Sequence, residues 1–259
     1  MKSAFEDYAS IVRQWRVWFL MAQQDISLRY RRSILGPFWI SISMAAMMFG
    51  LTLLYAEIFH MPFREYLSYI GAGLLAWNFM AILIMEGSTS ITEGEGILKN
   101  VPVPLSVLVF RALTRNIIVL GHNILVVGII LLVFGQRLDF SAFLVIPALI
   151  LVSILGFLFG MIAGPISARF RDIPQVLAAI MSVAFFLTPI MWNINQLSAR
   201  ASLAWYNPLY HMIELIRAPL LGAPPPLESW LVVIGINILL FIIATFSLGY
   251  FQRRIALWL

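Results

Sequence analysis

Three arginines stand close together just ahead of the first long apolar block: Arg29, Arg31 and Arg32. Guanidinium groups bind phosphate through paired, charge-assisted hydrogen bonds. This group could therefore hold the phosphates of a lipid-linked substrate at the membrane surface. Basic residues beside an apolar block also anchor a chain on ordinary lipid phosphates, and the sequence leaves both roles open.

A second polar group lies in the segment 87–106, where Glu93, Glu95 and Lys99 precede the run Val101-Pro-Val-Pro104. Charges next to a proline break are typical of a short surface helix or a plain loop. We expect a loop here that faces the cytoplasm, with a short helix that a soluble partner could grip.

Motifs for catalysis are missing from the sequence. It contains no GxxxxGK[ST] phosphate loop, so we expect ATP and Mg²⁺ to bind to another polypeptide and no cofactor to bind to this one. His60, His122 and His211 are far apart and no HExxH motif is present, which argues against a metal site or a hydrolytic enzyme. We expect His122 to make a hydrogen bond between helices rather than to relay protons.

The elements that carry these residues follow from composition. Of 259 residues, 61% are hydrophobic and 11% are charged, whereas soluble domains have roughly 45–50% and about 25%. The solvent of most side chains must be lipid, which predicts an all-α integral membrane protein. The basic residues lie between apolar blocks and form no stripe, so the net charge of +5 does not indicate nucleic acid binding.

Windows of about 20 apolar residues predict six transmembrane helices in one domain. They lie near residues 37–59, 66–85, 111–134, 143–165, 175–192 and 230–251. Thirteen of the 17 Lys and Arg residues fall on the side of the N-terminus. The positive-inside rule then puts both termini in the cytoplasm.

Two segments outside these spans also have helical signals. Ser3 and Glu6 have the spacing of a capping box before an amphipathic stretch over residues 3–23, so we expect residues 1–36 to form an interfacial helix and a basic turn. In the outer segment 193–226, Asn207 and Pro208 suit the start of a helix too short to cross the bilayer. This helix must lie on the surface or re-enter.

Side-chain spacing also suggests specific contacts. Glu214 and Arg217 stand at i, i+3 and could pair. Glycines repeat every fourth residue in the fourth span, which predicts close approach of another helix; they are Gly156, Gly160 and Gly164. Aromatic residues gather near the span ends as an interfacial belt or as stacking platforms for sugar rings; those of interest are Phe38, Trp39, Phe185, Phe186 and Trp192.

Taken in order along the chain, these segments resemble the membrane subunits of type-2 ABC exporters that move O-antigen, capsular polysaccharide or teichoic acid. The resemblance rests on Asp25-Ile-Ser-Leu-Arg-Tyr-Arg-Arg-Ser-Ile-Leu-Gly-Pro-Phe-Trp39, Ile97-Leu-Lys-Asn-Val-Pro-Val-Pro-Leu105, Ala168-Arg-Phe-Arg-Asp-Ile173, Leu187-Thr-Pro-Ile190 and Asn207-Pro208 with Glu214-Leu-Ile-Arg217. The segment 115–123 looks more like the O-antigen and capsule branch. Relatives often have Leu-Ile-Lys-Lys where this chain has Ile97-Leu-Lys-Asn100.

The resemblance implies a homodimer in the bacterial inner membrane with two copies of a cytoplasmic P-loop ATPase, exporting a polyprenyl-diphosphate-linked polysaccharide. It also implies roles for residues. Arg29, Arg31 and Arg32 would lie at the entrance, Glu93, Glu95 and Lys99 would dock on the ATPase, and the segment with Asn207, Pro208, Glu214 and Arg217 would form an outer gate. Trp39, Phe185, Phe186 and Trp192, with Phe38 beside them, would line the channel.

Three other functions stay open. A type-2 exporter of a small lipid or drug would have the same spans. An ion-coupled carrier or channel would normally need carboxylates inside the spans, which the sequence lacks. An enzyme acting on lipid-linked sugars would need convergent carboxylates, and Glu57, Glu86 and Glu214 lie far apart along the predicted topology.

Overall fold

The computed structural model describes residues 4–36, 38–134, 139–194, 204–252 and 254–258. Ser3 of the expected capping box, Pro37 and the stretch 195–203 of the expected outer segment lie outside the described residues. Within them the chain is helical and has no strand, which confirms the all-α prediction. The helices are α1 (Ala4–Arg13), α2 (Trp15–Arg29), α3 (Phe38–Ile58), α4 (Phe63–Glu93), α5 (Glu95–Leu98), α6 (Leu105–Val133), η1 (Phe140–Leu144), α7 (Val145–Arg169), α8 (Ile173–Leu187), α10 (Pro208–Leu220), α11 (Leu227–Gln252) and α12 (Ile255–Trp258).

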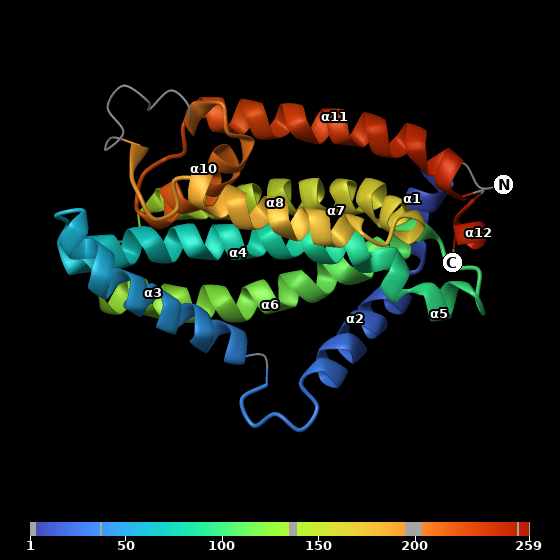
Figure 1. Cartoon of the computed structure of the whole chain (residues 1–259), viewed down its shortest axis with the longest axis horizontal. Coiled ribbons are helices and arrows are strands. Elements are labelled where there is room, and N and C mark those ends of the chain that lie inside the picture. Colours follow the sequence, from blue (N-terminus) through green and yellow to red (C-terminus); the bar gives the residue numbers. More distant parts are fainter. Residues whose placement is uncertain (1–3, 37, 135–138, 195–203, 253, 259) are drawn as a thin grey trace.

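Five helical segments of the described chain are long and apolar enough to cross a membrane. They are Phe38–Ile58, Phe63–Leu98, Leu105–Val133, Phe140–Arg169 and Leu227–Gln252. The expected fifth span corresponds to α8, whose 15 residues extend about 22 Å, less than the roughly 30 Å of a bilayer core. The count of six spans therefore stays a prediction. The helices α1, α5 and α12 lie at one end of the molecule, and α10 lies toward the other (Figure 1).

Two helices extend past the expected spans. The helix α4 continues to Glu93 instead of ending near residue 85, and α6 begins at Leu105 rather than 111, so the expected 87–106 loop shrinks to residues 94–104. A hydropathy window ends a predicted span where polar residues begin, because it assumes that lipid surrounds the helix. Other parts of the protein surround most of α4, since 78% of its apolar window is buried. The helix can therefore continue through polar residues.

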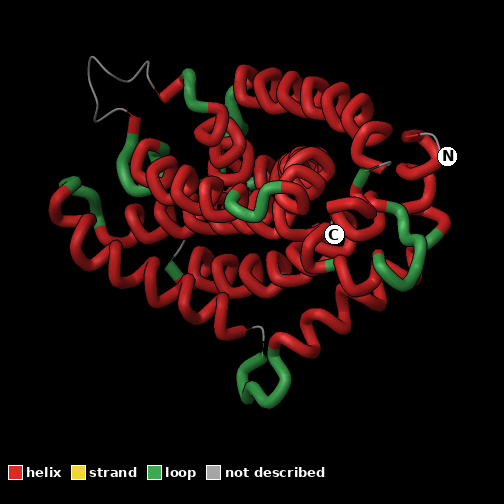
Figure 2. Tube along the Cα trace, turned by 45° about the vertical axis from the view of Figure 1, so that its right-hand side comes forward, coloured by secondary structure: helices red, strands yellow, loops and turns green. Residues whose placement is uncertain are grey.

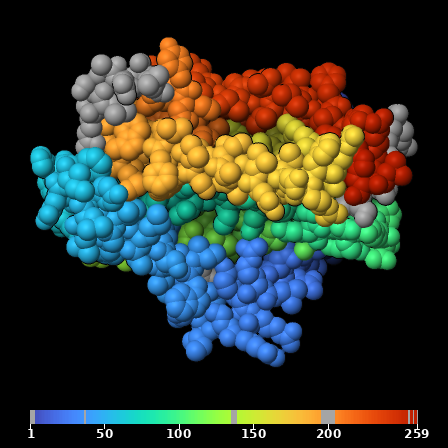
Figure 3. All heavy atoms as spheres, viewed as in Figure 1, coloured from blue at the N-terminus to red at the C-terminus, as the bar shows by residue number. Residues whose placement is uncertain are grey.

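The N-terminal helix also differs from expectation. It breaks at Gln14, with φ −108° and ψ 32°, and then continues as α2 to Arg29, which includes the start of the expected basic turn. The indole Nε1 of Trp18 donates a hydrogen bond to the carbonyl of Ile11 across this break at 2.8 Å. The chain then reverses at Arg32 and Gly36, which have φ of 68° and 54°. The α2–α3 connection projects from the bundle (Figures 1 and 2), and in the space-filling view the blue N-terminal part forms a protrusion (Figure 3).

The centre of the bundle is the contact between α4 and α7, the most extensive pair of elements. A Cβ placed on Gly87 would lie 3.2 Å from Cα of Gly160, and one placed on Gly164 would lie 2.9 Å from a side-chain carbon of Ile91. Backbones this close need glycine. The close approach predicted from the glycine spacing is therefore confirmed, and α4 is its partner.

Candidate functional site

A cluster of buried ion pairs joins α2, α4 and α6 near the end of the molecule that holds the termini. Arg115 on α6 is 4% exposed and its guanidinium lies 3.0 Å from Asp25, 2.7 Å from Glu86 and 3.1 Å from Glu93. Arg111, one helical turn earlier, lies 2.5 Å from Asp25. Charges removed from water in this way need such partners. The cluster therefore fixes α2 against the bundle.

The three arginines expected at an entrance separate into two kinds. Arg29 lies 3.0 Å from Glu86 and so belongs to the edge of the ion-pair cluster. Arg31 and Arg32 are exposed, and within the described part of the chain their guanidinium groups have no ion pair or hydrogen bond. In the turn that projects from the bundle, these two remain free to contact phosphate.

The residues expected to dock on a partner also separate. Glu93 points toward Arg115 and also accepts a hydrogen bond from Thr89 Oγ1 at 2.8 Å. Glu95 on α5 lies 2.7 Å from Lys99 and 3.1 Å from Arg171, and all three side chains reach the surface. Because Arg171 belongs to the turn between α7 and α8, this contact joins two connections at the same end of the bundle.

At the opposite end, α10 is held by buried polar contacts. Arg217 lies 2.5 Å from Glu214, as the i, i+3 spacing predicted, and donates to the carbonyl of Pro189 at 2.6 Å. Its guanidinium also lies over the ring of Tyr69, 4.4 Å from the centroid. Asn207 caps the helix through Leu209 N at 3.0 Å. The helix α10 is thus attached to α4 and to the turn after α8.

That turn, residues 188–192, has further attachments. Asn207 Nδ2 donates to Thr188 Oγ1 at 2.9 Å, and the hydroxyls of Tyr66 and Tyr69 donate to the carbonyls of Met191 and Trp192 at 2.8 and 2.9 Å. The expected end of α10 at Gly222 is confirmed by its φ of 82°. Pro208, Glu214 and Arg217 therefore belong to one rigid unit at this end.

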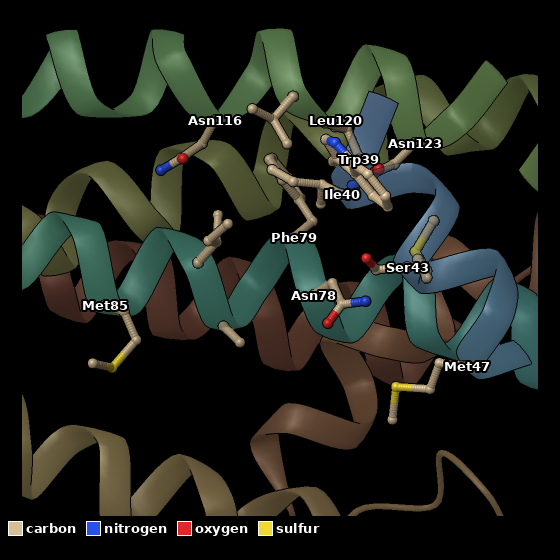
Figure 4. A pocket seen from close by; sticks show the side chains of 14 residues that line it. Trp39, Ile40, Ser43, Met47, Asn78, Phe79, Met85, Asn116, Leu120 and Asn123 are labelled. Carbon is tan, nitrogen blue, oxygen red and sulfur yellow. The ribbon is translucent and has the colours of Figure 1, made fainter. Parts of the chain in front are cut away.

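The aromatic residues divide between two neighbouring cavities. Phe185 and Phe186 line a cavity of about 360 Å³ between α3, α4 and α8, where Phe185 packs edge-on against Trp77 at 5.5 Å between ring centroids. Trp39 lines a second cavity of about 530 Å³ between α3, α4 and α6 (Figure 4). Met47 and Asn78 line both cavities, so the two are adjacent.

Phe38 and Trp192 line neither cavity. The ring of Phe38 packs edge-on against His122 at 5.0 Å, and Trp192 Nε1 donates to the carbonyl of Phe186 at 3.3 Å. The expectation for His122 was wrong, because its Nδ1 bonds to the carbonyl of Ile118 in its own helix at 2.8 Å. Asn123 makes an interhelical bond instead, accepting from Ser41 Oγ on α3 at 2.7 Å.

Sequence reasoning missed Trp77, Asn78 and Asn116, which line these cavities. Their signal was present but weak, since an asparagine inside an apolar block is a polar residue that needs an explanation. It also missed Asp25 and Glu86 as buried partners of Arg115. Only the packing of three helices brings these residues together.

Comparison with known proteins agrees with this architecture. Residues 16–221 match the family described as ABC-2 type transporter. The chain is 22% identical over 203 residues to the O-antigen export system permease protein RfbA of Myxococcus xanthus, covering 76% of this chain and 77% of that protein. It is 25% identical over 209 residues to the protein of the same name from Klebsiella pneumoniae, covering 75% and 76%.

The family match spans α2, the ion-pair cluster, both cavities and α10. It thus includes every feature described above as part of a candidate site, and the long apolar helices make the chain a multi-pass membrane protein. This chain belongs to the ABC-2 type transporter family, as the membrane subunit of a type-2 ABC exporter.

Proposed function

We propose that this chain is the membrane subunit of an exporter that moves a polyprenyl-diphosphate-linked polysaccharide, O-antigen or capsule, across the bacterial inner membrane. The observation that carries the proposal is the similarity to O-antigen export permeases over about three quarters of both chains. The aromatic and amide side chains around the two adjacent cavities support it, because aromatic faces hold sugar rings without requiring one hydrogen-bond pattern.

The energy would come from a separate P-loop ATPase, since the sequence has no phosphate-binding loop of its own. Two ATPase copies would bind two copies of this chain on the cytoplasmic side, where both termini would lie. The exposed contact of Glu95 with Lys99 and Arg171 suits a docking surface, because it presents two connections of the bundle as one unit. ATP and Mg²⁺ would stay on the ATPase.

Movement of the ATPase would then reach the bundle through α5 and α4. Glu93, at the end of α4, touches the ion-pair cluster that holds α2. A displacement of α5 would therefore tilt α2 together with α4. Arg31 and Arg32, in the turn after α2, would meet the diphosphate of the lipid carrier as it enters.

The outer end would act as the gate. Asn207, Pro208, Glu214 and Arg217 belong to a short helix fixed to α4 and to the turn after α8. Because this turn closely follows Phe185 and Phe186, a shift of α8 would move the gate together with these two aromatic side chains. Each sugar must bind only weakly to such side chains, because the polymer has to slide past them.

The test is made in cells that produce the glycan. Deleting the gene for this chain should remove the polysaccharide from the cell surface and leave lipid-linked glycan inside, and a purified tagged chain should bring down a P-loop ATPase. Exporters of a small lipid or a drug would leave surface polysaccharide unchanged after deletion. Transport that continues without any ATPase would support an ion-coupled carrier and contradict the proposal.

A further inference from the structure

The cavity between α3, α4 and α6 is lined by the side chain of Asn116, whose amide makes no hydrogen bond within the described part of the chain. Asn116 on α6 is 2% exposed, and neither its amide nitrogen nor its amide oxygen has a hydrogen-bond partner. Figure 4 shows this side chain pointing from α6 toward the space between α6 and α4. A buried amide without a partner loses its hydrogen bonds to water and gains none, so such groups are rare without a reason.

Other asparagines buried in the apolar helices have partners. Asn123 accepts from Ser41 Oγ at 2.7 Å. Asn237 on α11 donates through Nδ2 to the carbonyl of Leu151 on α7 at 3.3 Å and to that of Val233 at 2.9 Å, and only its Oδ1 has no partner in the described part of the chain. These two amides join helices. Asn116 joins nothing in the described part of the chain, which indicates that its partner comes from outside the protein.

The cavity has the size and access of a binding site. Its volume is about 530 Å³, within the range of about 300–1,000 Å³ found for small-molecule sites. The buried side chains of Phe79 and Leu120 form its floor, whereas Trp39 and Met47 at its edge are 52% and 44% exposed. A molecule could therefore enter the cavity at this edge, past α3.

The lining defines the chemistry of the occupant. The polar groups are the amides of Asn78, Asn116 and Asn123 and the hydroxyl of Ser43, and none of the described residues that line the cavity is charged. An amide both donates and accepts hydrogen bonds, which suits hydroxyl groups. Phosphates and carboxylates would lack a cationic partner here. Trp39 adds a flat aromatic surface at the edge, a combination that fits an uncharged polyhydroxyl ring.

We propose that this cavity binds one neutral sugar residue within a single subunit, with Asn116 as its main hydrogen-bonding residue and Trp39 against the ring. The inference rests on the proposed function, because it takes the exported glycan as the source of the sugar. Shape and chemistry alone admit two sources, a lipid-linked glycan that arrives through the bilayer and a free oligosaccharide that arrives through a water-filled path.

The experiment uses the full chain with its ATPase in nanodiscs of phosphatidylethanolamine and phosphatidylglycerol. Trp39→benzoylphenylalanine places a photo-reactive group of similar size at the edge of the cavity. The probes are polyprenyl-diphosphate-linked maltotriose, the same lipid diphosphate without sugar, and free maltotriose, and adducts are identified by mass spectrometry. Phe246→benzoylphenylalanine is the matched control, because Phe246 on α11 is 82% exposed and is not one of the residues that line the cavity.

We expect sugar-containing adducts at position 39 and only phospholipid adducts at position 246. Adducts with the lipid-linked sugar alone would identify the bilayer as its route, and adducts with both sugar probes would identify a water-filled route; either result supports the site. If position 39 gives no sugar adduct with either probe, or gives equal yields with the sugar-free diphosphate, the proposal is wrong.

A second pair of variants separates binding from folding. Asn116→Leu, nearly equal in volume, should lower the yield of sugar adduct by about tenfold, the equivalent of one or two hydrogen bonds. It should leave the melting temperature unchanged or raised, because an unpaired amide is removed. Asn237→Leu should lower the melting temperature and leave the adduct yield unchanged. A lower melting temperature with unchanged adduct yield in Asn116→Leu would make Asn116 structural and overturn the assignment.

The two proposals fail separately. If deletion of the gene removes surface polysaccharide but position 39 never captures sugar, the cavity is not a sugar site and the exporter assignment stands. If surface polysaccharide is unchanged by the deletion, the exporter assignment fails, and with it the glycan as the source of the sugar.

Discussion

Arg115 on α6 lies 3.0 Å from Asp25 on α2, although 90 residues separate them in the sequence. The contact is buried on both sides, with 4% and 13% of the two side chains exposed. Glu86 and Glu93 on α4 complete the surroundings of the same guanidinium. One arginine of α6 thus joins α2 to α4.

Removing this arginine should destabilise the protein strongly. Arg115→Met leaves three carboxylates without their shared partner, and breaking a buried ion pair costs about 3–5 kcal/mol. We expect a large drop in the melting temperature of the purified protein that added salt does not reproduce in the wild type, because buried pairs are poorly screened. Lys99→Met, which breaks an exposed pair, is the control and should change stability by less than about 1 kcal/mol. Similar effects of both variants would contradict the role of the cluster.

The contact between α5 and the α7–α8 turn should matter for transport more than for stability. Arg171→Glu would set a negative charge beside Glu95, 3.1 Å away in the wild type, and should change stability by at most about 1 kcal/mol since both groups are at the surface. Export per ATP hydrolysed should fall. The double variant with Glu95→Arg should recover export by restoring opposite charges, and a double variant as defective as the single one would count against this contact.

At the outer end, Arg217 should not tolerate replacement by lysine. Its guanidinium contacts Glu214, the carbonyl of Pro189 and the ring of Tyr69 at once, and an ammonium group lacks the planar fork needed for all three. Arg217→Lys should lower the melting temperature by several degrees. Arg64→Lys, at an exposed position near the start of α4, should leave it unchanged. A melting temperature equal to that of the wild type in Arg217→Lys would show that charge alone suffices.

The glycine contact between α4 and α7 gives a steric prediction. Gly87→Ala would put a methyl group 3.2 Å from Cα of Gly160, and backbone atoms cannot move aside as side chains do. Overpacking of this kind costs about 1–3 kcal/mol. Gly235→Ala on α11 meets nothing within 4 Å and should keep or slightly raise stability. The measurement is the melting temperature of each variant. Equal melting temperatures would mean that α4 and α7 can move apart without loss of stability, which would contradict the prediction.

The aromatic residues that line the two cavities should affect export without affecting assembly. The double variant Trp39→Ala with Phe185→Ala should slow polymer export, because each side chain borders one of the adjacent cavities. Phe38→Ala is the matched control, since Phe38 lines neither cavity and packs on His122 instead. Surface polysaccharide and co-purification of the ATPase are measured in parallel. Normal export in the double variant would exclude these aromatics from the path.

Composition and local spacing were enough to predict an all-α membrane protein, the close approach at the α7 glycines, the start and stop of α10, and the pair of Glu214 with Arg217. Each of these depends on residues near one another in sequence. The full length of α4 could not be predicted in this way. Most of its apolar window, 78%, is buried against other parts of the protein, and local hydropathy does not show this.

The candidate site was harder to predict. The sequence predicts an entrance role for Arg29 and a docking role for Glu93, but it does not predict their ion pairs with Glu86 and Arg115. In each pair the partner lies on another helix. Asn116 has no sequence neighbour that marks it. Its significance comes from its position at the cavity between α3, α4 and α6, and a sequence pattern does not reveal such a cavity.

The central position of α4 has a consequence for how the chain can change over evolutionary time. Within its apolar window 78% of residues are buried in protein, against 22% for α11. Substitutions at the exposed positions of α11 need only preserve hydrophobicity, whereas those in α4 must preserve the shape of each side chain that meets α6, α7 or α10. We therefore expect the exposed positions of α11 to drift freely among leucine, isoleucine, valine and phenylalanine, and α4 to change only together with its neighbours.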